Sequence, residues 1–170
     1  MKKFVLMLSV VLVVIASLMG CAIKKPPQKI DINASGLYTD RGKIRVSGDT
    51  NLPKGSILTL QISEVGKTDL VYDEKIQVEK DDGYFNWLDT SFDASKDYNI
   101  NLYFIPNNQP KEIQKKYGEN GEYIKKTDDS GIEVDDQGKV VLHQTTTIQK
   151  TDGFTTGGYF NLYTVAAPKK

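Results

Sequence analysis

From Gly36 onward the sequence alternates apolar and polar residues in short runs, which is the pattern of β-strands with one buried face. In the run ILTLQIS, for example, Leu58, Leu60 and Ile62 fall on the same side of an extended chain. Turn signals such as NLPKGS, VGKT and KDDG separate the runs. Short strands that recur about every ten residues predict an all-β chain whose sheets pack face to face as a β-sandwich.

The segment FDASKDYNINLYF, which begins at Phe92, narrows the fold class. It resembles a strand of immunoglobulin-like and fibronectin-type-III-like domains, where a large apolar residue precedes a turn and a tyrosine then opens the strand. Tyr98 would be that tyrosine, and Ile100, Leu102 and Phe104 would be the alternating apolar positions. The resemblance implies an immunoglobulin-like β-sandwich in which the Tyr98 hydroxyl bonds back to the main chain.

One helical signal interrupts the strands, in QPKEIQKKYG. Pro110 suits the first turn of a helix, Ile113 and Tyr117 lie four apart on one face, and Gly118 suits its end. We therefore expect one short helix between strands. GIEVDD, KVVLHQTTTIQK and GYFNLYTVA predict later strands, so residues 36–170 are expected to form a single β-sandwich domain.

The first residues of the chain predict export. Two lysines follow Met1, and residues 4–19 contain no charged residue and no proline. This run is shorter than the roughly 20 apolar residues that a membrane-spanning helix needs. Residues 1–20 therefore read as a cleaved signal peptide.

The end of this segment, Leu18-Met19-Gly20-Cys21, resembles the lipobox of bacterial lipoproteins. The resemblance implies cleavage between Gly20 and Cys21 and attachment of diacylglycerol to the Cys21 thiol, which would place the protein on the extracytoplasmic side of the cell membrane. An uncleaved membrane anchor and ordinary secretion with a free thiol are the alternatives. Residues 21–35, with Pro26-Pro27, are expected to form an extended tether.

Cysteine count and charge limit the function classes. Cys21 is the only cysteine, so a lipidated chain has no disulfide, thiol nucleophile or cysteine metal site. Removing residues 1–20 takes two lysines and no acid from 22 basic and 22 acidic residues, which leaves a formal charge of −2. That charge does not favour nucleic acid as a partner.

The histidine and the aspartate doublets, whose side chains could take part in catalysis or metal binding, are predicted to be structural residues. His143 is the only histidine and lies in the predicted strand VVLHQTT, so we expect a partly buried strand residue. Three aspartate doublets each have a glycine within two residues and predict turns, and none has the order of an EF-hand calcium loop: they are Asp81-Asp82, Asp128-Asp129 and Asp135-Asp136. A weak calcium site and a glycosidase-like pair of carboxylates are the alternatives. We predict no catalytic residues, no metal and no cofactor.

The last predicted strand is the most informative about binding. Tyr159, Phe160 and Tyr163 place aromatic rings on both parities of an extended chain. Such a strand is either buried on both faces or an exposed edge used for pairing or binding. These three residues form the candidate binding face.

Together these observations predict a membrane-anchored surface lipoprotein that acts as a non-catalytic binding module of the cell envelope. Its partners would be the membrane, through the lipid on Cys21, and a protein or an envelope polymer. An envelope hydrolase, or a structural or assembly subunit of an envelope complex, is the alternative.

Overall fold

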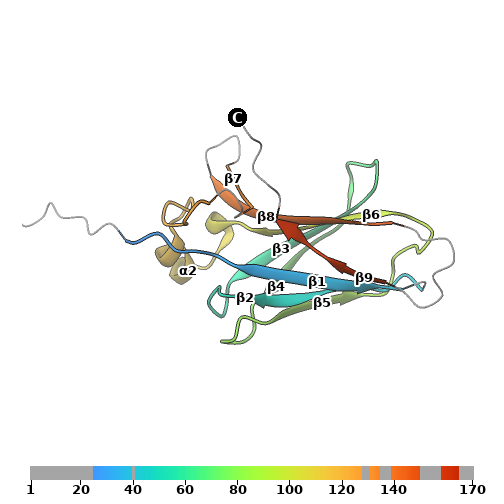
Figure 1. Ribbon diagram of the computed structural model, residues 1–170, viewed down its shortest axis with the longest axis horizontal. Helices are drawn as coiled ribbons and strands as arrows, with labels where there is room; N and C mark the ends of the chain where they lie inside the picture. The colour runs from blue at the N-terminus through green and yellow to red at the C-terminus, as the bar shows by residue number, and fades with distance from the viewer. Residues whose placement is uncertain (1–24, 40, 128–130, 135–138, 150–157, 165–170) are drawn as a thin grey trace, which may run out of the picture.

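The computed structural model describes residues 25–39, 41–127, 131–134, 139–149 and 158–164. Within them, two antiparallel sheets pack face to face (Figure 1). The predicted signal peptide, the lipobox with Cys21, and the doublets Asp128-Asp129 and Asp135-Asp136 lie outside the described residues. No helix of the described part is long and apolar enough to cross a membrane.

The first sheet has four strands in the order β5-β2-β1-β9. Their bounds are β1 Ile32–Tyr38, β2 Ile44–Thr50, β5 Phe85–Asp89 and β9 Gly158–Asn161. The second sheet has the order β10-β8-β6-β3-β4, and β7 also pairs with β8. Its strands are β3 Ile57–Glu64, β4 Leu70–Gln77, β6 Tyr98–Phe104, β7 Ile132–Val134, β8 Val140–Ile148 and β10 Tyr163–Thr164.

The fold is an all-β, immunoglobulin-like sandwich with one short α-helix, as predicted. The chain changes sheets after β2, β4, β5, β8 and β9, and the first three changes give the Greek-key connectivity of such domains. The alternating residues form the core between the sheets. Leu58, Leu60 and Ile62 of β3 are fully buried there.

The predicted tyrosine corner is present at the start of β6. The Tyr98 hydroxyl donates to the Asp93 carbonyl oxygen at 3.2 Å and accepts from the Asp93 N–H at 3.1 Å. Burial raises the pKa of Tyr98, because it disfavours the phenolate. The hydroxyl thus fixes the turn before β6 while the ring packs against Phe92, with centroids 5.1 Å apart.

The predicted helix is α2, Lys111–Tyr117, which follows the short 3-10 turn η1, Pro106–Asn108. Gly118 ends it with a φ of 89°, a conformation that favours glycine. Ile113 and Tyr117 are buried, and the Tyr117 ring meets Phe104 of β6 edge-on at 5.5 Å. The helix therefore closes one end of the sandwich (Figure 1).

The domain begins earlier than predicted. β1 starts at Ile32, ahead of the boundary at Gly36, and Ile30, Ile32 and Ala34 are buried. Gln28 also exchanges main-chain hydrogen bonds with the loop after α2, at Tyr123 and Lys125. The alternation of apolar residues already starts at Ile30, but the prolines and lysines just before it favoured a tether.

Candidate functional site

The last strand crosses from one sheet to the other. β9 pairs with β1 of the first sheet, opposing Tyr159 to Leu37, and the Leu162 N–H then donates to the Ala34 carbonyl oxygen at 2.9 Å. β10 pairs with β8 of the second sheet and opposes Tyr163 to Thr145. Figure 1 shows this segment passing from beside β1 to beside β8. The crossing spans one of the two open sides of the sandwich.

The structure does not bring Tyr159, Phe160 and Tyr163 together on one face, so the predicted binding face is corrected. Tyr159 is 93% exposed on the outer surface of the first sheet, and Tyr163 is 65% exposed on that of the second. Phe160 turns inward and packs against the core. The segment is therefore an edge rather than a strand buried on both faces.

Gly36 explains why Phe160 turns inward. The two residues are opposed in the β1–β9 ladder. A Cβ atom on Gly36 would lie 2.3 Å from Phe160 Cζ, so the ring occupies space that any other residue would fill. The glycine thus fixes the register that sends Tyr159 outward.

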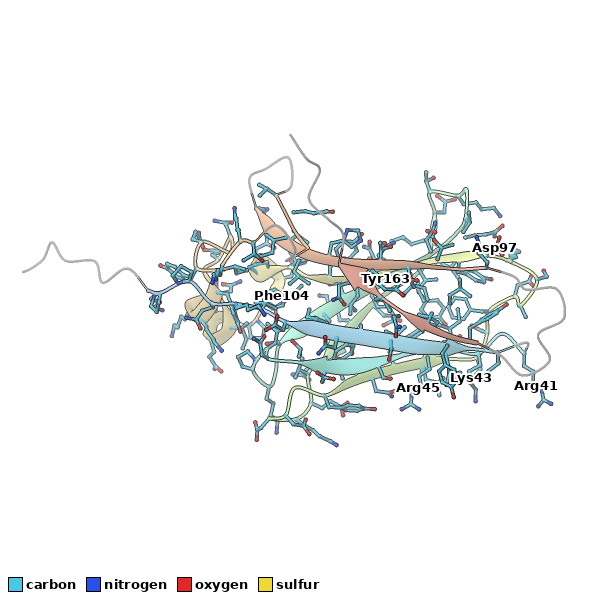
Figure 2. All side chains as sticks on the ribbon, in the orientation of Figure 1. Arg41, Lys43, Arg45, Asp97, Phe104 and Tyr163 are labelled. Atoms are coloured by element: carbon cyan, nitrogen blue, oxygen red, sulfur yellow. The ribbon has the colours of Figure 1, made fainter. Side chains whose placement is uncertain are left out.

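A groove of about 430 Å³ lies where the strand leaves β1, and we call it the crossover groove. It is bordered by β1, β2, β8 and the crossing segment. The polar and aromatic side chains among its described lining residues are Asn33, Ser35, Asp49, Gln144, Asn161 and Tyr163. Figure 2 shows Tyr163 beside the crossing.

Gln144 is the buried polar residue of this groove, with 5% of its surface exposed. Its Nε2 donates to the Ile32 carbonyl oxygen of the opposite sheet at 2.6 Å. Its Oε1 is buried and has no hydrogen-bond partner among the residues that the structure describes. A buried acceptor without a donor costs about 1–3 kcal/mol, so this atom favours a ligand that supplies one.

Among the lining residues of the groove that the structure describes, only Asp49 carries a charge. The Asn33 Nδ2 donates to Asp49 Oδ2 at 3.1 Å across the β1–β2 ladder. Ser35 and Asn161 are opposed in the β1–β9 ladder, and both are exposed. Hydroxyl and amide groups therefore face the groove from neighbouring strands.

His143 lies on the outer face of the second sheet, away from the groove, as a partly buried strand residue. Its Nδ1 is 3.3 Å from Glu133 Oε1, its Nε2 is 3.0 Å from Asn101 Oδ1, and its ring stacks on Tyr103 with centroids 4.3 Å apart. These contacts tie β6, β7 and β8 together. The prediction of a strand residue agrees with this placement.

The described aspartates serve the local structure. Asp82 accepts a hydrogen bond from the Tyr84 N–H at 3.1 Å, as expected of a turn residue. Asp89 accepts from the Ser91 and Tyr72 hydroxyls, both at 2.5 Å, and these bonds lower the pKa of Asp89. No group of three His, Cys, Asp or Glu residues suited to a metal ion occurs in the described part of the chain.

Sequence reasoning missed Asn33, Asp49 and Gln144. A signal existed for Gln144, because it occupies the buried parity of β8 between Leu142 and Ile148, where an apolar residue is the norm. Asn33 lies in residues 21–35, which the sequence predicts to be an extended tether. Comparison of the chain with protein-family models, curated proteins and solved structures finds no match.

Proposed function

We propose that this protein is a lipid-anchored, non-catalytic binding module of the bacterial cell envelope, and that the crossover groove is its binding site. The anchor rests on the lipobox-like Leu18-Met19-Gly20-Cys21. Two acyl chains hold a protein stably at a membrane, whereas one holds it only marginally. The immunoglobulin-like domain would then present the groove outside the cell.

The observation that carries the binding role is the unpartnered Gln144 Oε1 in a groove bordered by both sheets. A volume of about 430 Å³ falls within the usual range of ligand sites. The rigid ladders of β1, β2 and β8 hold the lining side chains in place. A site built on strands is preorganised, which reduces the entropy lost on binding.

The same groove argues against hydrolysis. Among its described lining residues Asp49 is the only carboxylate, and it already accepts a hydrogen bond from Asn33. Glycoside hydrolysis commonly uses a pair of carboxyl groups as acid and base or nucleophile. If Asp49→Asn abolished an envelope-cleaving activity, the hydrolase alternative would replace this proposal.

The anchor is tested by metabolic labelling with a palmitate analogue. Cys21→Ala should lose the label and accumulate as an unprocessed precursor, because the sequence contains no other thiol. A cleaved Cys21→Ala variant that stays in the membrane fraction would contradict lipidation.

The binding role is tested by capture of a solubilised envelope fraction on the immobilised full chain. Tyr163→Ala removes an exposed ring from the groove and should reduce capture at least about tenfold. Tyr159→Ala is the matched control, because it removes an even more exposed tyrosine ring of the same segment that lies outside the groove. Equal capture by all three proteins would contradict binding at the groove.

A further inference from the structure

We infer that the crossover groove binds one sugar unit of a neutral glycan, an inference that rests on the binding role proposed above. Three kinds of observation favour a sugar: the mixture of amide and hydroxyl groups, the buried unpartnered acceptor, and an exposed aromatic ring. They come from the first sheet, the second sheet and the crossing strand respectively.

The amide and hydroxyl side chains match neighbouring hydroxyl groups. Each sugar hydroxyl donates one hydrogen bond and accepts others, and an amide offers both donors and acceptors in one plane. Asn161 and Ser35 are exposed on neighbouring strands, and Asn33 lies at the end of the same face. Two adjacent hydroxyls can therefore meet donors and acceptors at once.

Gln144 lines the groove and favours a ligand that donates a hydrogen bond. Its Nε2 is already bonded to Ile32, so only the acceptor Oε1 remains for a ligand. Because Oε1 is buried, a ligand hydroxyl reaches it only if the groove wall opens slightly, and the bond would then recover the cost of leaving the oxygen unpaired. A purely apolar ligand would leave that cost in place.

The charges favour a neutral ligand. The described lining residues include no lysine or arginine, so a phosphate, sulfate or uronate group would lack a charged partner. The single carboxylate among these residues, that of Asp49, already accepts a hydrogen bond from Asn33. A cationic ligand would therefore meet one partly satisfied carboxylate, whereas a neutral polyol meets every polar group on the rim.

Tyr163 supplies an apolar surface at the rim. Its ring is 65% exposed and belongs to the edge strand β10. A sugar ring has one face made largely of C–H groups, which can pack on an aromatic face while the hydroxyls point toward the amides. The ring thus completes a site that is polar on one side and apolar on the other.

The first test separates a glycan from a protein partner. The envelope fraction is delipidated, digested with proteinase K, and captured on the immobilised full chain at about 0.5 M NaCl, which screens exposed charges. We expect capture to survive and to remain sensitive to Tyr163→Ala. Capture lost on digestion, or lost only at high salt, would overturn the neutral glycan, although a groove-dependent signal before digestion would still support the binding role.

The second test uses defined probes. Calorimetry of the full chain in a detergent without a sugar headgroup is run with cellotetraose, maltotetraose and tetra-N-acetylchitotetraose. At least one should bind, and Asn161→Ala should weaken that binding about tenfold or more. Asn108→Ala, an exposed amide beside α2 and outside the groove, should match the unmodified chain. Failure of all three probes at about 10 mM, or equal weakening by both variants, would contradict the inference.

Discussion

Gln144 Nε2 donates a hydrogen bond to the Ile32 carbonyl oxygen at 2.6 Å and so joins β8 of one sheet to β1 of the other. On the opposite open side of the sandwich, the Tyr72 hydroxyl of β4 donates to Asp89 Oδ2 of β5 at 2.5 Å. A polar contact between the sheets therefore lies at both open sides. The Gln144 side differs because its Oε1 is left without a partner among the described residues.

Two replacements of Gln144 should distinguish the contribution of its donor, Nε2, from that of its acceptor, Oε1. Gln144→Leu removes the bond to Ile32 but also removes the unpaired Oε1, so the two effects should largely offset each other and change the free energy of unfolding by less than about 1.5 kcal/mol, equally at pH 4.5 and pH 7.5. Gln144→Glu should cost more at pH 7.5, where a buried carboxylate faces the Ile32 carbonyl, than at pH 4.5, where the protonated carboxyl can donate. Urea titrations at both pH values measure the difference. The same loss for Gln144→Glu at both values would contradict this role of the bond.

Gly36 should be intolerant of a side chain. In Gly36→Ala the new methyl group would lie 2.3 Å from Phe160 Cζ and 2.1 Å from the Arg45 carbonyl oxygen, so the strands must shift. We expect a loss of about 1–3 kcal/mol and faster hydrogen exchange in β9. Gly158→Ala is the control, since no atom of the described residues other than its chain neighbours lies within 4 Å of its Cβ position. Equal behaviour of the two variants would mean that Phe160 does not depend on Gly36.

The inner strands of the second sheet were largely predictable, whereas the groove was not. The spacing of Leu58, Leu60 and Ile62 predicts β3, because burial of one face of a strand requires apolar residues at alternate positions. Tyr98 predicts the start of β6, because the tyrosine corner needs a hydroxyl at that point. The position of the last strand depends on contacts far apart in sequence, such as that between Gly36 and Phe160. Local periodicity contains no information about which sheet an edge strand joins.

Local periodicity also could not predict which residues line the candidate site. The exposed rings of Tyr159 and Tyr163 look equivalent in the sequence, but the crossing at Leu162 sends them to different sheets. Asn33 and Gln144 lie more than a hundred residues apart and meet only because β9 and β10 leave part of β1 uncovered. No motif signals such a pairing.

Alkaline pH should weaken the domain through Tyr117. Burial raises the pKa of Tyr117 from 10.0 to about 12. In the unfolded chain this phenol ionises near pH 10, so between pH 10 and pH 12 the unfolded state binds fewer protons and the free energy of unfolding falls. The contribution is fully present below pH 10 and should decline by about 2 kcal/mol by pH 12. Tyr117→Phe should show a correspondingly shallower decline in urea titrations across this range, whereas parallel curves would place the ring in water.

The central claim, a sugar site at the crossover groove, is tested most directly by the side-chain amide signals of the full chain. Proton–nitrogen NMR spectra in dodecylphosphocholine micelles, assigned with single-residue variants, are compared before and after addition of the tetrasaccharide that binds most tightly in calorimetry. The account predicts shifts at Asn33, Gln144 and Asn161, which line the groove, and none at Asn86 or Asn99, which lie on the outer faces of the two sheets. Shifts confined to Asn86 or Asn99, or no shifts at saturating sugar, would contradict it.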